Sequence, residues 1–330
     1  MRSPAFAYVR ASDAAHAVAL GALPGAAFLA GGTDLLQLWK SGAAAPERLV
    51  DISRLVLDAI DGSGDGLRLG ATAKLSDVAA HPDVMRDYPL VAEAISASAS
   101  GQLRNMATVG GNLLQRTRCP YFRTHAQGKC NKREPQSGCG ARTGENRTAA
   151  LFGASEACVA THPSDLAVAL VALDAEVRIL GPAGERQILL TDLYRLPGQE
   201  PARDTVLAAG ELLTELRLRP DARFAAHSSY LKVRDRASFE FAVVSVAAAL
   251  RIENGFIAEA RLAAGGVAPR PWRLRACEAA LVGRVPDGAA LAAAAGLASE
   301  GAAPLAGNGF KVELLRRAAL RALQTAASRP

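Results

Sequence analysis

Four of the five cysteines of this 330-residue chain lie within one 40-residue stretch that shows little periodicity. The stretch at 116–157 is rich in Gly, Pro, Arg, Thr and Ser, so we expect a loop that something other than a hydrophobic core holds in place. A chain that gathers its thiols in this way usually needs them together, for a metal or iron–sulfur site or for disulfides. The four are Cys119, Cys130, Cys139 and Cys158.

The spacing of these cysteines leaves three alternatives open. Ten, eight and eighteen residues separate them, and no CxxC occurs, which fits neither a zinc ribbon nor a bacterial ferredoxin run. A [4Fe–4S] cluster, a four-thiolate zinc site and disulfides in an oxidising compartment each remain compatible with four thiols. We interpret Cys277, which lies in a helical pattern, as a buried structural thiol.

The net positive charge of the chain is concentrated in the same stretch. The formal charge is +6, and residues 116–147 hold eight basic and two acidic residues, while the remainder has 30 of each. A nucleic-acid-binding protein more often spreads basic residues over a docking face, so we expect no nucleic-acid partner. The basic residues are Arg116, Arg118, Arg123, Lys129, Lys132, Arg133, Arg142 and Arg147.

Length and composition favour two soluble domains. Half of the residues are apolar, and 330 residues can form two cores. No run reaches the roughly 18 apolar residues of a membrane helix, and Arg10, Asp13 and His16 interrupt any N-terminal signal-like stretch. We therefore expect a soluble chain without a membrane span, cytoplasmic unless a partner that carries an export signal takes it to the periplasm.

Two glycine pairs indicate a phosphate-binding region. Residues 26–40 predict a buried strand, a turn at Gly31-Gly32 and a helix that Thr33 or Asp34 caps. The sequence Thr108-Val-Gly-Gly-Asn112 repeats this chemistry. Bare glycines let backbone N–H groups approach a pyrophosphate closely, and two such loops favour a ligand with two phosphates and an extended body.

Other known motifs are missing from the sequence. It contains no GxGxxG, no P-loop, no HExxH and no GxSxG, and no catalytic acid–base set stands out. We therefore expect any chemistry to belong to bound cofactors.

The C-terminal part predicts a small α+β domain that begins near residue 221. Strands at 230–236, 243–253 and 256–262 precede helices from 272 onward, and Asn254-Gly255 is the strongest hairpin signal in the chain. Before it, Ser164-Asp165 caps an apolar helix, residues 176–190 form a hairpin and residues 211–219 form a strand.

Five motifs together resemble the FAD-binding medium subunit of the molybdenum hydroxylases, a family that includes xanthine dehydrogenase, carbon monoxide dehydrogenase and aldehyde oxidoreductases. They span nearly the whole chain in the family's order. They are LAGGTDLL (29–36), LRNMATVGGNLLQ (103–115), HPSDLAVALVALDA (162–175), ELLTELRL (211–218) and YLKVRD…FAVVSVAAAL (230–250).

The cysteine stretch narrows the resemblance. Most of the family lacks these cysteines, and RTRCPYFR…KCNKREPQSGC followed by Cys158 resembles the bacterial aldehyde oxidoreductase flavin subunit that carries an extra [4Fe–4S] cluster. The flavin subunit of 4-hydroxybenzoyl-CoA reductase also carries such a cluster, but the sequence around its cysteines differs. The resemblance therefore implies FAD and a [4Fe–4S] cluster on Cys119, Cys130, Cys139 and Cys158.

The resemblance also implies a fold and a set of FAD contacts. It implies an α+β fold, with a two-lobed FAD-binding domain at 1–221, a cluster-binding insert at about 116–158 and a C-terminal α+β domain at 222–330. Asp165 would bind the ribose or adenine end, and Lys232 and Leu212 would lie near the flavin. The implied FAD contacts are Ala26, Ala27, Phe28, Leu29, Ala30, Gly31, Gly32, Thr33, Asp34, Thr108, Gly110, Gly111, Asn112, Asp165, Leu212 and Lys232.

The implied function is electron transfer inside a heterotrimeric aldehyde oxidoreductase. Substrate oxidation would occur on a large molybdenum-cofactor subunit, and electrons would pass through two [2Fe–2S] clusters of a small subunit to FAD and then to an external acceptor. A xanthine dehydrogenase-like or 4-hydroxybenzoyl-CoA reductase-like subunit is the nearest alternative. Because the glycine loops lie outside the insert, we expect loss of a cysteine to leave FAD binding largely intact.

Two alternatives come from other classes. A zinc-stabilised basic module would bind nucleic acid with steep salt dependence, but it gives the glycine loops no role. A stand-alone flavin oxidase would need its own substrate pocket with an acid or base, which the sequence does not reveal.

Overall fold

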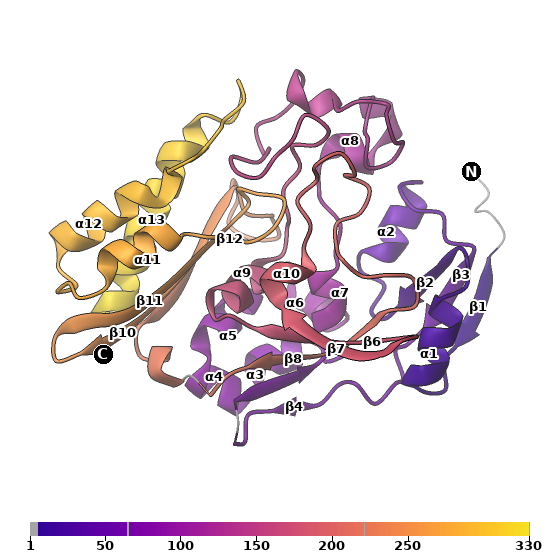
Figure 1. Cartoon of the computed structure of the whole chain (residues 1–330), viewed down its shortest axis with the longest axis horizontal. Coiled ribbons are helices and arrows are strands. Elements are labelled where there is room, and N and C mark those ends of the chain that lie inside the picture. Colours follow the sequence, from indigo (N-terminus) through magenta and orange to yellow (C-terminus); the bar gives the residue numbers. More distant parts are fainter. Residues whose placement is uncertain (1–5, 65, 221, 330) are drawn as a thin grey trace.

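Three β-sheets organise the computed structural model, which describes residues 6–64, 66–220 and 222–329 (Figure 1). Two of them lie in the N-terminal part and one in the C-terminal part. The expected domain boundary falls at Asp221, which lies outside the described residues.

The first lobe is a small parallel sheet in the order β1-β3-β2. Parallel neighbouring strands need crossover connections. One helix lies in the connection from β1 to β2 and another in the connection from β2 to β3. Val18 of α1, Val50 of β3 and Leu212 pack together beneath this sheet. Its elements are β1 (Ala7–Arg10), α1 (Ala14–Gly21), β2 (Ala26–Leu29), α2 (Leu35–Lys40) and β3 (Arg48–Asp51).

The second lobe is a five-stranded antiparallel sheet with helices around it. Its strands, in sheet order, are β4 (Ile60–Asp61), β5 (Leu67–Gly70), β8 (Leu212–Leu218), β6 (Glu176–Gly181) and β7 (Gly184–Leu189). Its helices are α3 (Leu75–Ala80), α4 (Pro82–Asp87), α5 (Pro89–Ser96), α6 (Gly101–Arg104), α7 (Val109–Leu113), α9 (Asp165–Ala172) and α10 (Leu190–Leu193).

The cysteine insert has little regular structure, as its composition predicts. It contains α8 (Pro120–Arg123) and two single turns of 3-10 helix, His125–Gln127 and Gly140–Arg142. In Figure 1 it lies at the top of the molecule around α8, above the sheets of the N-terminal part. Its apolar contacts include two small clusters, one around Phe122 and one around Val159, while Leu151 and Phe152 near its end join the core of the C-terminal domain.

The C-terminal domain is a four-stranded antiparallel sheet covered by helices on its outer face (Figure 1). The predicted hairpin is present. Its turn residues, Asn254 and Gly255, both have positive φ angles, of 52° and 83°. The strands are β9 (Ser228–Val233), β10 (Val244–Glu253), β11 (Phe256–Gly265) and β12 (Trp272–Arg273). The helices are α11 (Arg275–Leu281), α12 (Gly288–Gly296) and α13 (Phe310–Ser328), with 3-10 turns at Ala222–Phe224 and Leu297–Ser299.

Both faces of the C-terminal sheet are buried. The face of β10 that carries Val244 and Val246 packs against the outer helices, while Ala247 and Ala249 join the core of the N-terminal domain. These small side chains let α9, in which every residue is buried, lie close against the sheet.

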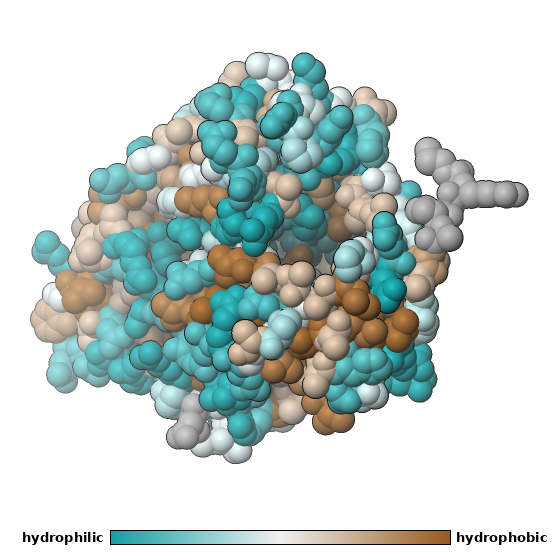
Figure 2. Space-filling view, turned by 45° about the vertical axis from the view of Figure 1, so that its right-hand side comes forward, coloured by the Kyte–Doolittle hydropathy of each residue, from teal (hydrophilic) through white to brown (hydrophobic). Residues whose placement is uncertain are grey.

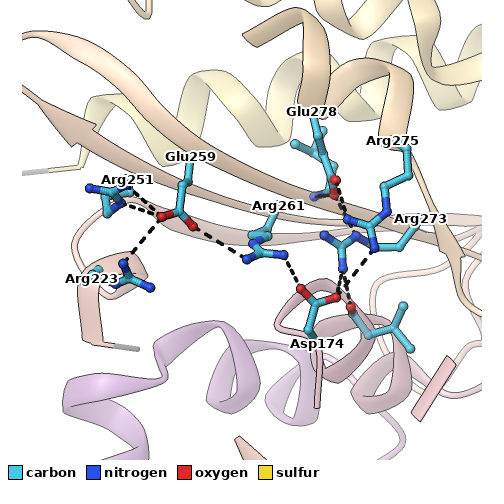
Figure 3. Close-up of polar contacts among 10 residues, drawn as sticks. Asp174, Arg223, Arg251, Glu259, Arg261, Arg273, Arg275 and Glu278 are labelled. Carbon is cyan, nitrogen blue, oxygen red and sulfur yellow. Dashed lines mark hydrogen bonds and ion pairs between the residues drawn. The ribbon is translucent and has the colours of Figure 1, made fainter. Parts of the chain in front are cut away.

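Ion pairs reinforce the contact between the domains (Figure 3). Asp174, just after α9, accepts from Arg261 of β11 and Arg273 of β12. Glu278 of α11 holds the other side of Arg273 at 2.7 Å. The two domains are thus fixed to each other, and the α+β fold class is confirmed.

Candidate cofactor sites

The first glycine loop passes close to the backbone of a distant segment. A Cβ on Gly31 would lie 1.9 Å from the carbonyl oxygen of Met106, and Gly32 has a φ of +70°. Both positions therefore require glycine. Asp34 occupies the N-cap position of α2, as expected for Thr33 or Asp34, but its side chain makes no cap hydrogen bond.

The second glycine loop is stabilised by side chains on both sides. The Thr108 hydroxyl accepts a hydrogen bond from the Gly111 N–H at 3.2 Å and caps α7. The Ser164 hydroxyl donates to Oδ1 of Asn112 at 2.6 Å. Ser164 also caps α9, so the start of this buried helix orients the amide of Asn112.

Asp34 points toward the cysteine insert. Its carboxylate accepts hydrogen bonds from the Arg116 backbone N–H at 2.8 Å, from Arg118 at 2.9 Å and from Arg123 at 2.8 Å. The Asp34 and Arg123 side chains are only 13% and 15% exposed, so water screens these ion pairs weakly. The first glycine loop is therefore tied to the insert, although some 80 residues separate them in the sequence.

Two neighbouring cavities meet at the glycine loops. The first, the loop cavity, has a volume of about 310 Å³ and lies along both glycine pairs. The second, the interface cavity, has about 470 Å³ and reaches from Asn112 to Phe241 of the C-terminal domain. Thr33 and Gln115 line both cavities, so the two cavities are neighbours. Figure 2 shows one face of the molecule, with hydrophobic residues beside a hollow near its middle.

Asp165 lines the interface cavity and belongs to a buried polar group. Its carboxylate accepts from the Tyr230 hydroxyl and from Lys232 Nζ, each at 2.7 Å. Burial raises the pKa of Asp165 above its ordinary value, and Lys232 opposes the shift. Lys232 also donates to the Ala97 carbonyl and lies behind Asp165, outside both cavity linings.

Most of the expected FAD residues line the two cavities. Four of them line neither cavity: Ala26, Ala27 and Leu29, which lie in β2, and Lys232. Asn112 and Asp165 line the interface cavity. The residues at the loop cavity are Phe28, Ala30, Gly31, Gly32, Thr33, Asp34, Thr108, Gly110, Gly111 and Leu212.

Sequence reasoning missed the contribution of the insert to these cavities. Arg116 lines the loop cavity, and Arg118 lines the interface cavity. Burial lowers the pKa of Arg118 to about 10, so it stays charged at neutral pH. Its buried Nε has no hydrogen-bond partner among the described residues, which leaves a donor for a ligand. The signal was available, since both arginines follow directly on the second glycine loop.

The four expected cysteines line one small cavity, here called the cysteine cavity. Cys130 and Cys139 face each other in an isolated antiparallel bridge. Asn131 accepts from the Gly138 N–H at 2.7 Å and donates to the Ala157 carbonyl at 2.9 Å, which joins this turn to the segment before Cys158. The tertiary structure thus gathers thiols that lie far apart in the sequence.

The arrangement of the thiols limits what the cysteine cavity can hold. All five cysteines are free, so the disulfide alternative is not realised. In the described part of the chain, no three His, Cys, Asp or Glu side chains converge closely enough to hold a single metal ion. Thiolates bind one zinc ion at about 2.3 Å and must converge tightly.

A buried cation lies beside the thiols. Lys132 lines the cysteine cavity, is only 6% exposed and donates to Pro201 O at 2.7 Å and to Asp204. Burial raises the pKa of the Cys158 thiol to about 11, and the charge of Lys132 opposes the shift. Lys132 thus places a cation beside the thiols, although Asp204 already pairs with it.

No helix among residues 6–64, 66–220 and 222–329 is long and apolar enough to span a membrane.

The fold and the paired glycine loops define a protein that binds an elongated ligand with a diphosphate. A family model described as "FAD binding domain in molybdopterin dehydrogenase" matches residues 4–220, and one described as "CO dehydrogenase flavoprotein C-terminal domain" matches residues 228–326. The chain therefore belongs to the FAD-binding subunits of the molybdopterin dehydrogenase family. FAD is accordingly its cofactor, and the chain is an oxidoreductase subunit.

Individual relatives are similar over most of their length. The aldehyde oxidoreductase FAD-binding subunit PaoB of Escherichia coli is 50% identical over 281 residues, 84% of this chain and 86% of PaoB. The carbon monoxide dehydrogenase medium chain of Hydrogenophaga pseudoflava is 27% identical over 100% of this chain and 99% of its own. Among solved structures, quinoline 2-oxidoreductase from Pseudomonas putida 86 is similar with a TM-score of 0.76 and 25% identity, covering 99% of this chain and 98% of that chain.

Proposed function

We propose that FAD lies across the loop cavity and the interface cavity, with its diphosphate between the two glycine loops. Thr33 and Gln115 line both cavities, and this adjacency is the observation that carries this proposal. The adenine end would occupy the loop cavity beside Phe28 and Leu212, and the flavin ring would occupy the interface cavity beside Asp165. This orientation is the reverse of the one that the resemblance implies, in which Asp165 binds the ribose or adenine end and Leu212 lies near the flavin.

In this arrangement each part of the chain has a separate task. The Gly31-Gly32 turn would present backbone N–H groups to the diphosphate. At the second loop the N–H groups of Gly110 and Gly111 already bond the Ala71 carbonyl and the Thr108 hydroxyl, so these glycines line the cavity only as bare backbone. Arg116 and Arg118 would supply positive charge near the diphosphate. Lys232 and Tyr230 hold the Asp165 carboxylate in one orientation from behind. Bound FAD supplies the transfer of two electrons, accepted one at a time.

We propose further that the cysteine cavity holds a [4Fe–4S] cluster on Cys119, Cys130, Cys139 and Cys158. The sulfurs surround one cavity without converging on a single ion, and Lys132 offsets negative charge. The small apolar clusters of the insert agree with this, because a group bound by four thiolates would replace a missing core.

The chain would then be the FAD and [4Fe–4S] electron-transfer subunit of a molybdenum-dependent aldehyde oxidoreductase. The relative at 50% identity bears that activity in its name, which supports the assignment. Residues 1–221 would bind FAD and the cluster, and residues 222–330 would form the C-terminal domain. A small subunit with two [2Fe–2S] clusters and a large molybdenum subunit would deliver the electrons, and an external acceptor would take them. The location would be cytoplasmic, or periplasmic with an exported partner.

Metal and cofactor analysis of the purified protein tests this proposal. We expect four irons and four acid-labile sulfides per FAD, with no zinc. One zinc without sulfide would overturn the cluster, and salt-sensitive binding to DNA or RNA would then revive the nucleic-acid alternative. Protein without FAD would contradict the flavin site.

Assay of the complete complex tests the substrate class. We expect oxidation of aromatic or aliphatic aldehydes and little activity on xanthine. Faster turnover of a purine, or reduction of a hydroxybenzoyl thioester, would instead support the xanthine dehydrogenase-like or 4-hydroxybenzoyl-CoA reductase-like alternative.

A further inference from the structure

A further cavity of about 300 Å³, the insert cavity, lies between the cysteine insert, the start of α9 and the C-terminal domain. None of its lining residues borders the loop cavity, so the proposed position of the FAD diphosphate does not involve it. Its floor is largely apolar and includes Ala141, Ala149, Val159 and Val243. The volume is at the low end for small-molecule sites.

The insert cavity shares a thin wall with the interface cavity. Arg118, Pro163 and Phe241 line both cavities, as do Asp165 and Glu240. The guanidinium carbon of Arg118 lies 4.6 Å from the centre of the Phe241 ring, so these two side chains form a stacked pair in the wall. The two cavities are therefore direct neighbours along these five residues.

The insert cavity also borders the thiols. Cys119 lines both the insert cavity and the cysteine cavity. A molecule in the insert cavity would thus lie between the two proposed cofactors, within one side chain of each.

The charges around the insert cavity disfavour an anionic ligand. Arg118 is the one lysine or arginine in its lining, and Asp34 already pairs with it. Against it stand Glu145, Asp235 and Glu240. Among the described residues, Asp235 pairs with Arg147 and Glu240 pairs with Arg236. The Glu145 carboxylate accepts a long hydrogen bond, of 3.4 Å, from the Arg147 backbone N–H. Two phosphates of a nicotinamide dinucleotide would find no unpaired cation in this lining and would lie near the Glu145 carboxylate.

We propose that the insert cavity binds an uncharged quinone as the electron acceptor of the flavin, an inference that rests on the proposed FAD site. Phe241, Pro120 and Pro163 offer flat apolar surfaces to a ring. The reduced flavin loses two electrons and two protons and returns to its oxidised form. The quinone gains both electrons and both protons and leaves as the hydroquinone, so no further reactant is needed.

Reoxidation of the flavin in the FAD-loaded protein with its partner subunits tests the proposal. The flavin is reduced anaerobically, mixed with menadione, an uncharged naphthoquinone, and followed by the return of oxidised flavin absorbance. Ala242→Phe adds a ring on the C-terminal side of the cavity, away from the cysteines and outside the interface cavity lining. We expect it to slow reoxidation by about tenfold or more. Ala183→Phe, in the exposed turn between β6 and β7, is the matched control and keeps the wild-type rate.

A charge change tests the same site without filling it. Glu145→Lys removes negative charge at the cavity and should speed reoxidation by a naphthoquinone sulfonate several-fold relative to menadione, and Glu185→Lys on β7 should not. Wild-type rates with menadione in Ala242→Phe, or an unchanged sulfonate preference in Glu145→Lys, would overturn the quinone site. So would faster reoxidation by NAD than by menadione in the native protein. Protein that lacks FAD would instead contradict the proposed function.

Discussion

The glycine loops are supported by extensive apolar cores, whereas the part of the insert that holds Cys119, Cys130 and Cys139 has small apolar clusters and a set of ion pairs, and only its end, at Leu151 and Phe152, joins a large core. The second glycine loop contributes Val109 and Leu113, both fully buried, to the largest core. The insert is instead fastened by polar contacts, such as those of Arg123 and Lys132. A segment without its own core depends on its bound group and on its neighbours, so the two regions should respond differently to the same kind of damage.

Loss of one cysteine should have the largest effect. We expect Cys130→Ser to lose the iron and sulfide completely and to disorder the insert. Because Asp34 takes three donors from the insert, FAD affinity should also fall, by about tenfold. The ion pairs thereby change our expectation from the sequence that FAD binding would be largely unaffected.

Iron, sulfide and FAD titration check this outcome. Cys277→Ser, in α11 and away from the cysteine cavity, is the control and should keep its iron. Full FAD affinity in Cys130→Ser would show that the two regions are independent.

Gly31→Ala should produce the opposite pattern. A Cβ 1.9 Å from the Met106 carbonyl forces the two glycine loops apart, so we expect FAD affinity to fall by about a hundredfold or more while the iron remains. Isothermal titration with FAD and iron analysis measure both effects. In Gly296→Ala the new Cβ meets no atom within 4 Å, so that variant should bind FAD normally. Loss of iron in Gly31→Ala would contradict the asymmetry.

His162 makes the junction of the insert with the second glycine loop sensitive to acid. It hydrogen-bonds the Leu113 carbonyl at 3.2 Å, and burial lowers its pKa to about 4. The unfolded chain takes up a proton near the ordinary value of 6.5, so stability falls as the pH decreases from about 6.5 to 4. At pH 5 this loss is about 2 kcal/mol.

His162→Gln removes the titrating group. We expect its free energy of unfolding to depend less on pH between 7 and 5, by about 2 kcal/mol, in urea titrations. A His16→Gln variant is the control, since His16 lies at the surface on α1. Parallel pH profiles of wild type and His162→Gln would contradict the role of burial.

Asp34→Asn should have the smallest effect. The amide keeps the size of the carboxylate but loses its charge, so we expect FAD to bind about fivefold more weakly, a change of roughly 1 kcal/mol. Iron content should stay above nine-tenths of the wild-type value. Asp192→Asn, at an exposed position of α10, should change neither quantity. An unchanged FAD affinity in Asp34→Asn would mean that the link from insert to glycine loop is energetically neutral.

Local sequence determined the elements and the two cofactor motifs. Apolar periodicity predicted α9, and Asn254-Gly255 predicted the β10–β11 hairpin, because turn and helix preferences act within a few residues. The glycine pairs were recognisable for the same reason, since Gly32 needs a positive φ whatever surrounds it.

Only the tertiary structure decided how these parts meet. It turned Asp34 from an expected helix cap into an anchor for arginines more than 80 residues away, and it set Lys232 behind Asp165. It also gathered four thiols without a recognisable spacing around one cavity. Ion pairs and cavity walls join side chains from distant segments, and their geometry depends on how the whole chain packs, which local preferences do not encode.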